Sequence, residues 1–232
     1  MAGAMAPGSE RGARRRDEAE AAAGLSAREL ACVRGERGLF ADISFDLAPG
    51  QCLHVAGDNG AGKTSLLRIL AGLLAPAGGQ VLWRGRELAR AREEFASDLA
   101  FVGHLNGIKD DLTVLENVQL AGAVRGSGQG QDAAREALRA MGLEDYAQLL
   151  ARHLSQGQKR RVALARLCTR PAAPLWILDE PFNALDAGSV AGLRALIEAR
   201  LAAGGIVVLT AHQPVELPAG ARRLELAGEP PA

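Results

Sequence analysis

Short apolar runs separated by turn residues fill the first third of the chain. The runs that we expect to form strands lie at residues 43–47, 52–56 and 81–83, with glycine or proline close by. Runs of this length between turn residues are typical of strands. Residues 63–74 instead carry leucines at helical spacing, and this spacing predicts one helix among the strands.

The middle third of the chain changes to a helical pattern. Thr113 stands three positions before Glu116, which is the spacing of a capping box at the start of a helix. We expect three helices in this part of the chain, over about residues 113–124, 132–142 and 155–168. Together they predict a helical insertion over about residues 104–170.

Two brief and wholly apolar runs mark the last third of the chain, at residues 175–178 and 206–209. Strands that are buried on both faces have this composition. An alanine-rich helix is expected between them, over about residues 188–203. The order strand, helix, strand predicts a parallel pair. We therefore expect an α/β fold with a mixed core sheet, an antiparallel β subdomain and the helical insertion.

Composition narrows the class of protein. Of the 232 residues, 48% are hydrophobic and 23% are charged, so the chain can bury a core and is not expected to be globally disordered. Twenty-seven basic residues balance 27 acidic ones, which argues against nucleic acid as a partner. The three cysteines are far apart and lack a C-x-x-C pair, so we expect reduced thiols rather than disulfides or a zinc site.

Residues 1–24 contain almost no large apolar side chain. We expect them to form a disordered tail, which leaves residues 25–232 as one domain. No apolar run approaches the length that crosses a bilayer, and the N-terminus has no apolar stretch of the kind found in secretory signals. The chain is therefore expected to stay on the side of the membrane where it is made.

A phosphate-binding loop is predicted directly after the expected strand at residues 52–56. The residues that fit G-x-x-x-x-G-K-[ST] are Gly57, Asp58, Asn59, Gly60, Ala61, Gly62, Lys63 and Thr64. Glycines let successive backbone N–H groups face one anion, and the following helix adds the partial positive charge of its N-terminus. We expect Lys63 to contact the β- and γ-phosphates, Thr64 to bind Mg²⁺ and Ser65 to reach the α-phosphate.

Two acidic residues, Asp179 and Glu180, follow the apolar run at residues 175–178. Ionised side chains at the tip of a buried strand are costly unless a partner such as Mg²⁺ compensates them. By analogy with P-loop nucleotidases, we expect Asp179 to hold the metal through water and Glu180 to polarise the water that attacks the γ-phosphorus. The alternative, a solvated strand end, becomes weak beside a phosphate loop.

Three further segments resemble motifs of the ABC-type ATPases. The segment that resembles their signature motif consists of Leu154, Ser155, Gln156, Gly157 and Gln158. Residues 183–186, which end in Asp186, resemble the D-loop of that family, and His212 in residues 210–213 resembles its switch histidine. The motifs occur in the family's order over about residues 28–227. The resemblance implies that the chain binds ATP and Mg²⁺ and hydrolyses ATP.

The resemblance also implies a homodimer in which each active site is shared. Ser155 is expected to cap a helix whose N-terminus, with the Gly157 amide, faces the γ-phosphate held by the opposite subunit. His212 is expected to hold the attacking water together with Glu180. The third signature residue is Gln156 where the family has glycine, but Ser155 and Gly157 are present.

Residues 101–117 support a narrower resemblance. This stretch stands in the place of the family's Q-loop and, with L-W-I-L-D-E-P and T-x-H-Q, resembles the ATP-binding subunits of haem exporters in cytochrome c maturation. The resemblance implies integral membrane subunits as partners and a peripheral location on the cytoplasmic face of the bacterial inner membrane.

His104 stands where most ABC ATPases have the Q-loop glutamine. Imidazole is a poor ligand for Mg²⁺, which prefers hard oxygens. We therefore expect His104 to serve coupling to the membrane subunits rather than metal ligation. The alternative is a histidine that fills space at the end of a strand.

Two rival functions and one question of binding stay open at this point. The chain could be a soluble ABC ATPase of a cytosolic assembly system such as iron–sulfur cluster construction, or a switch that dimerises on ATP without useful hydrolysis. Adenine usually stacks on an aromatic residue upstream of the phosphate loop, but residues 33–38 contain none. Arg34, Arg37 or Phe40 could take that place.

Overall fold

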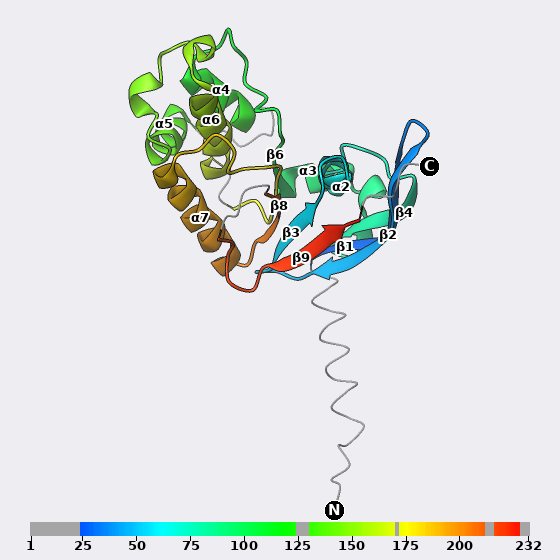
Figure 1. The fold of residues 1–232 in the computed structure, drawn as a ribbon. Coiled ribbons are helices and arrows are strands. Elements are labelled where there is room, and N and C mark those ends of the chain that lie inside the picture. The colour runs from blue at the N-terminus through cyan, green and yellow to red at the C-terminus, as the bar shows by residue number, and fades with distance from the viewer. Residues whose placement is uncertain (1–23, 124–129, 170–171, 212–215, 228–232) are drawn as a thin grey trace, which may run out of the picture.

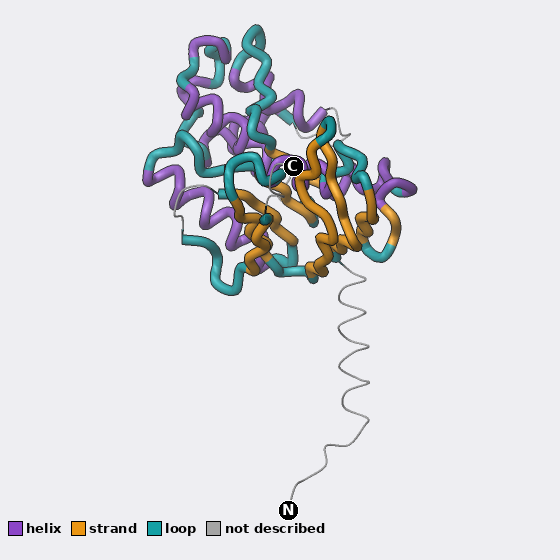
Figure 2. Tube along the Cα trace, turned by 45° about the vertical axis from the view of Figure 1, so that its right-hand side comes forward, coloured by secondary structure: helices purple, strands orange, loops and turns teal. Residues whose placement is uncertain are grey.

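The computed structural model describes residues 24–123, 130–169, 172–211 and 216–227. They form two β-sheets with a group of helices to one side, as Figures 1 and 2 show. The expected tail lies outside the described residues except for Gly24. This glycine is buried, and its carbonyl accepts a hydrogen bond of 2.8 Å from the Arg84 backbone N–H, so Gly24 belongs to the folded part.

The smaller sheet is antiparallel and has the strand order β2-β1-β4-β5. Its strands are β1 (Leu25–Arg34), β2 (Arg37–Leu47), β4 (Gly78–Trp83) and β5 (Arg86–Glu87). The expected strands at residues 43–47 and 81–83 lie inside β2 and β4. The expected strands do not include β1, whose first half has the sequence LSARE and contains no apolar run. The short helices η1 (Leu88–Arg90) and α3 (Arg92–Asp98) follow β5.

The larger sheet is parallel in all its described pairs and has the order β6-β7-β8-β3-β9. Its strands are β3 (Cys52–Gly57), β6 (Leu99–Val102), β7 (Leu175–Leu178), β8 (Ile206–Thr210) and β9 (Arg222–Leu226). The predicted parallel pair, β7 with β8, is confirmed. The sequence predicts both parallel and antiparallel strand pairs. In the structure, the described parallel pairs form the core sheet and the antiparallel pairs form a separate sheet.

Helices cover both faces of the parallel sheet. Alternate residues of β7 enter different cores: Leu175 and Ile177 join the core that contains α2 (Lys63–Leu70), whereas Trp176 and Leu178 join the core of α6 (Gln156–Cys168) and α7 (Ala187–Ala202). Every residue of β7 and β8 is buried, as the two apolar runs predict. Packing from both sides holds the strand ends that carry the motifs.

Helix α2 ends at Leu70, earlier than the leucine spacing predicts. The N–H groups of Leu73 and Leu74 turn back to the Arg68 carbonyl at 2.8 and 3.2 Å, and Gly72 lies between with a φ of 69°. A glycine in the left-handed conformation commonly closes a helix in this way. The last two leucines of the pattern are therefore exposed rather than packed.

The helical insertion has a core of its own. Its elements are α4 (Val114–Ala123), α5 (Gln131–Ala140), η2 (Glu144–Tyr146), η3 (Ala151–His153) and α6. Val118, Leu138 and Val162 are fully buried where α4, α5 and α6 meet. The predicted capping box is confirmed, because the Thr113 N–H donates to Glu116 Oε2 at 2.7 Å and the Glu116 N–H donates to Thr113 Oγ1 at 3.1 Å.

Two global features bear on the class of protein. Within the described ranges, no helix has the length and apolar character needed to span a membrane. Cys32, Cys52 and Cys168 are free thiols, and burial raises the pKa of the Cys52 thiol to about 11. A buried thiol with a raised pKa stays protonated and unreactive.

Candidate functional site

The phosphate loop connects the end of β3 to the start of α2, as predicted. Three of its glycines have left-handed backbones: Gly57 with a φ of 135°, Gly60 with 84° and Gly62 with 97°. A side chain at Gly57 would also collide with the Leu226 carbonyl, 2.5 Å from an added Cβ. Glycine is required at these positions because L residues avoid such angles.

Lys63 is buried at the first position of α2. Its Nζ donates to the carbonyls of Gly57 and Asp58 at 2.6 and 2.8 Å, so the loop closes around its own lysine. The ammonium group is therefore held beside the backbone that curls to receive an anion. This placement agrees with its expected contact with phosphates.

Strand register explains why Asp179, the first of the two predicted acids, lies beside the phosphate loop. Leu178 pairs with Leu209, so the next residues, Asp179 and Thr210, also lie side by side. Asp179 is 1% exposed, and its two carboxylate oxygens accept hydrogen bonds from Thr64 Oγ1 at 2.9 Å and Thr210 Oγ1 at 2.8 Å. The structure thus joins Thr64 to Asp179, the two predicted metal-binding residues.

The donor set at this point fits Mg²⁺. Thr64 and Asp179 offer hard oxygens within hydrogen-bond distance of each other, at the edge of a phosphate loop. Mg²⁺ is typically held by one or two protein oxygens, with phosphates and water completing its shell. The described part of the chain holds no group of three or more histidine, cysteine and acidic side chains that would suit a different metal.

Glu180 sits at the tip of β7 with a φ of 50°, an uncommon angle for a residue with a side chain. Its backbone N–H donates to Thr210 Oγ1 at 2.8 Å, and Asn183 Nδ2 donates to its carboxylate. The carboxylate borders the hollow above the phosphate loop. Position and exposure therefore suit the predicted role as the base that takes a proton from water.

His104 lies beside Glu180, with 3.6 Å between His104 Nδ1 and Glu180 Oε2. The register of β6 and β7 explains this contact, since Val102 pairs with Leu178 and the chains continue in parallel. The imidazole is 61% exposed, so it does not fill space in the core, contrary to the alternative left open above. The neighbouring Leu105 is 85% exposed, which is unusual for a large apolar side chain.

The predicted capping role of Ser155 is confirmed. Ser155 Oγ accepts from the Gln158 N–H at 3.2 Å, and Gln158 Oε1 accepts from the Ser155 N–H at 2.8 Å, which makes a capping box at the start of α6. Ser155 and Gln156 are exposed, while Leu154 is buried. A side chain at Gly157 would collide with the Ala184 carbonyl, 2.6 Å from an added Cβ.

The signature residues do not line the phosphate hollow of their own chain. That hollow has a volume of about 250 Å³, and its lining consists of Arg34, Leu39, Asn59, Gly60, Gly62, Lys63, Thr64, Ser65 and Glu180. In Figure 1, α6 lies with the helical insertion, on the other side of the molecule from α2. Ser155 is therefore not part of the hollow beside Lys63.

Arg34 and Leu39 come from the segment upstream of the phosphate loop, where an adenine contact is expected. Both residues line the hollow, but Phe40 is buried with its ring against Gly62, 3.0 Å from an added Cβ. Phe40 therefore cannot present a ring face to a base without leaving the core. Of the three candidates that the sequence left open, only Arg34 borders the hollow.

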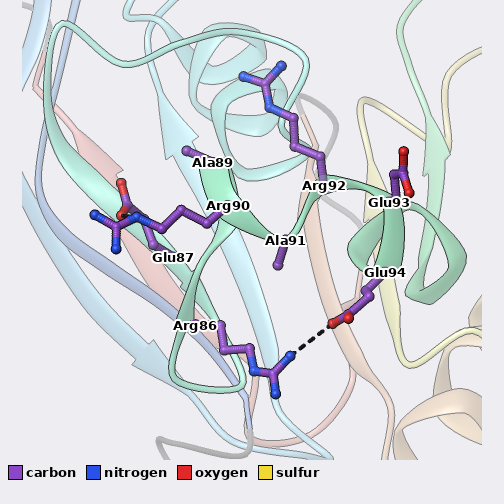
Figure 3. Close-up of a pocket in the computed structure, with 8 residues that line it drawn as sticks. All are labelled: Arg86, Glu87, Ala89, Arg90, Ala91, Arg92, Glu93 and Glu94. Atoms are coloured by element: carbon purple, nitrogen blue, oxygen red, sulfur yellow. Dashed lines mark hydrogen bonds and ion pairs between the residues drawn. The ribbon is translucent and has the colours of Figure 1, made fainter.

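A larger cavity of about 650 Å³ lies away from all of these motifs. Figure 3 shows its lining, which consists of Arg86, Glu87, Ala89, Arg90, Ala91, Arg92, Glu93 and Glu94. Arg86 pairs with Glu94 at 3.1 Å and Arg90 with Glu87 at 2.9 Å, so much of its charge is compensated within the wall. The larger of the two cavities is therefore not the one that contains the predicted site residues.

Two predicted site residues need separate mention. Asp186 is the N-cap of α7, where its Oδ1 accepts from the Ser189 N–H at 2.8 Å, and this bond holds the pKa of the carboxyl below its usual value. His212 lies outside the described residues. Thr210, Asn183 and Arg160 contact the predicted acids or their backbone, although sequence analysis assigned them no role.

The fold and the site together define the nucleotide-binding domain of a P-loop ATPase. A model of the ABC transporter family matches residues 40–183. The chain therefore belongs to the ABC transporter family, as its motifs predict.

Relatives confirm the narrower resemblance as well. The chain is 49% identical to the "Cytochrome c biogenesis ATP-binding export protein CcmA" of Dechloromonas aromatica over 86% of this chain and 97% of that protein. It is 47% identical to the protein of the same name from Pseudomonas aeruginosa, over 83% and 95% of the two chains.

Solved structures agree with the fold. An ATP-binding subunit of an ABC transporter has a TM-score of 0.73 and 26% identity, and the match covers 81% of this chain and 79% of that chain. A dimeric ATP-binding cassette in a post-hydrolysis state, bound to ADP and Pi, also has a TM-score of 0.73, with 25% identity and coverage of 82% and 88%.

Proposed function

We propose that this chain is the ATP-hydrolysing subunit of an ABC-type membrane complex that handles haem for c-type cytochrome biogenesis. The proposal rests on one observation: Lys63, Thr64 and Glu180 line one hollow, and Asp179 accepts a hydrogen bond from Thr64. The chain is also 44–50% identical to several cytochrome c biogenesis export proteins. Those relatives make the soluble assembly ATPase the weaker candidate.

Hydrolysis follows from the positions of these side chains. The phosphate loop and Lys63 would bind the triphosphate, and Thr64 and Asp179 would hold Mg²⁺, which would neutralise charge at the phosphates. Glu180 accepts a proton as water attacks the γ-phosphorus. The bond from that phosphorus to the bridging oxygen breaks, and ADP and phosphate leave.

The complete site is proposed to form between two copies of the chain. The exposed N-terminus of α6, capped by Ser155, offers N–H donors that its own hollow does not use. In a two-fold dimer it would face the γ-phosphate of the partner. The dimeric relative with ADP and Pi bound supports such an arrangement.

Integral membrane subunits are proposed as the further partners, which would place the chain peripherally on the cytoplasmic face of the inner membrane. The exposed Leu105 beside His104 supports this proposal, because a docked partner would cover an apolar side chain next to the catalytic carboxylate. The test is whether the full-length chain hydrolyses ATP and co-purifies with integral proteins from solubilised membranes. Recovery of an active chain with no integral partner would favour the soluble alternative.

We expect Arg34 to hold the base, so that Arg34→Ala weakens ATP binding. Stacking of a guanidinium on an aromatic ring contributes ~0.5–2 kcal/mol, and such a loss raises the Kd by about 2- to 30-fold. Arg37→Ala, at the other side of the same hairpin end, is the matched control. Equilibrium titrations with ATP and with tripolyphosphate check the result, since only ATP has a base. Equal weakening for both ligands would show that Arg34 acts on phosphate charge instead.

We expect His104→Gln to uncouple hydrolysis from the work of the complex. The exchange removes an exposed imidazole that lies 3.6 Å from the Glu180 carboxylate and precedes the exposed Leu105 in the chain. Single residues commonly change coupling by ~0.5–2 kcal/mol, so cytochrome c matured per ATP hydrolysed should fall by about 2- to 30-fold. Parallel assays of turnover and of complex-dependent maturation measure this ratio. If neither quantity changes, His104 has no role in coupling.

A further inference from the structure

Arg160 is buried in the interior of the protein, although the sequence around it indicates a solvated helix face. It lies between Lys159 and Arg161 in α6, and three adjacent basic residues usually point to water. Lys159 does pair with Asp110 on the outside, at 2.6 Å. Arg160 is only 4% exposed, so its side chain turns inward toward the parallel sheet.

All five N–H groups of the Arg160 guanidinium donate hydrogen bonds. Nη2 donates to the carbonyls of Asp179 at 2.7 Å and Glu180 at 2.8 Å, and Nε donates to the Pro181 carbonyl at 3.4 Å. Nη1 donates to the Gly103 carbonyl at 2.9 Å and to Asn106 Oδ1 at 3.1 Å. Every acceptor is an uncharged oxygen, so the contact is a clamp on the backbone and not an ion pair.

The clamp joins two segments that border the chemistry. Residues 179–181 carry the metal-binding and general-base positions, and residues 103–106 carry His104 and Leu105. These segments are far apart in the sequence and meet because β6 pairs with β7. One planar group therefore fixes the backbone on both sides of the contact between His104 and Glu180.

Burying the charged guanidinium of Arg160 costs free energy, yet the protein keeps this charge in its interior. Burial lowers the pKa of the Arg160 guanidinium, and the charges of Asp179 and Glu180 oppose that shift. Arginine has five donors in a rigid fork, whereas lysine has three on a flexible stem and cannot satisfy the same five oxygens. The geometry therefore requires arginine at residue 160 if all five bonds are to persist.

We propose that Arg160 is a positioning residue for ATP hydrolysis. It acts through the backbone of Glu180 and the loop at residues 103–106, and it sets where the Glu180 carboxylate and His104 stand over the phosphate loop. This inference rests on the proposed function, because it assumes that Glu180 serves as the base.

Arg166, one and a half turns further along α6, provides a matched comparison. It is also partly buried, burial also lowers its pKa, and it donates to the carbonyls of Asn106 at 3.2 Å and Gly107 at 2.9 Å. Among the described residues, its hydrogen bonds go to the loop and not to residues 179–181. Arg166→Lys therefore reproduces the loss of a buried guanidinium without releasing the backbone of Glu180.

The test compares Arg160→Lys with Arg166→Lys in the full-length chain, together with any integral subunits that co-purify. For Arg160→Lys we expect kcat to fall by roughly 10- to 100-fold, since small misplacement of a catalytic group has effects of that order. KM for ATP and the Kd for nucleotide should stay within about threefold of the parent values, because the phosphate loop is untouched. Arg166→Lys should keep kcat within about threefold of the parent.

A second variant keeps the proposal testable if Arg160→Lys does not fold. Asn106→Leu removes one acceptor of the clamp from a half-buried loop residue and leaves the core of α6 intact. We expect a smaller fall in kcat, again without a change in KM. Thermal unfolding of each variant shows whether it is folded; if Arg160→Lys is not, Asn106→Leu decides the question.

The outcomes separate this inference from the proposed function. If the parent does not hydrolyse ATP, or if Glu180→Gln hydrolyses as fast as the parent, the proposed function or its base is wrong. If the parent is active and Glu180→Gln is not, but Arg160→Lys retains the parent kcat, the clamp alone is refuted. Equal loss of kcat in Arg160→Lys and Arg166→Lys would likewise refute it, because general packing of α6 would then explain both.

Discussion

Glu180→Gln is expected to abolish most ATP hydrolysis while ATP binding is retained. Glutamine has nearly the same shape and can still accept the hydrogen bond from Asn183, but it cannot take a proton from water. A positioned general base contributes roughly 10²- to 10⁴-fold to a rate, so kcat should fall by about that factor. Because ATP would then persist at the site, dimers should accumulate in its presence.

Phosphate release at saturating MgATP measures the first effect, and size-exclusion chromatography with and without ATP measures the second. Glu94→Gln is a suitable control, since Glu94 forms an exposed ion pair with Arg86 and is not part of the phosphate loop. That control should keep the parent rate. A Glu180→Gln variant with the parent turnover would assign the base to another residue.

Lys63→Ala is expected to weaken nucleotide binding strongly. The ammonium group supports the loop through the carbonyls of Gly57 and Asp58 and stands where the phosphates enter. Hydrogen bonds to charged groups contribute ~1.5–3 kcal/mol each, so the loss of one such contact raises the Kd for ATP by about 10- to 150-fold. Hydrolysis at ATP concentrations below the raised Kd should therefore fall by about the same factor.

The chain has three lysines, and one of them is a good control for this exchange. Lys109 is exposed, and within the described residues its hydrogen bonds come from its backbone, to Asn117 and Leu112. Lys109→Ala should bind ATP like the parent in the same equilibrium titration. If Lys63→Ala binds ATP with the parent affinity and Lys109→Ala does not, the phosphate loop has been assigned wrongly.

Local patterns predicted much of the fold because they report on nearby residues. The apolar runs of β7 and β8 indicate burial on two faces, and the capping boxes at Thr113 and Ser155 mark where helices begin. The end of α2 was predicted wrongly, since the leucine spacing continues past Gly72, whose left-handed backbone closes the helix. A periodic pattern alone does not show where a glycine leaves the helical conformation.

The site was predicted in part for the same reason. The glycines of the phosphate loop, Lys63 and Thr64 are adjacent in the chain, so one motif contains them all. Thr210 belongs to the T-x-H-Q segment that supports the family resemblance, but its hydrogen bond to Asp179 follows only once β8 lies beside β7. Arg160 is still less visible, as it stands in a basic run and only its buried side chain distinguishes it.

The sequence by itself determined the candidate chemistry of this protein. Short stretches of adjacent residues contain the phosphate loop, the candidate metal-binding acid, the candidate base and the capped signature helix. Only the tertiary structure decided how these parts meet. The parallel register of β6 with β7 brings His104 to Glu180, and the register of β7 with β8 brings Thr210 to Asp179. Contacts of this kind depend on which strands pair, and pairing is set by the packing of the whole core and not by neighbours along the chain.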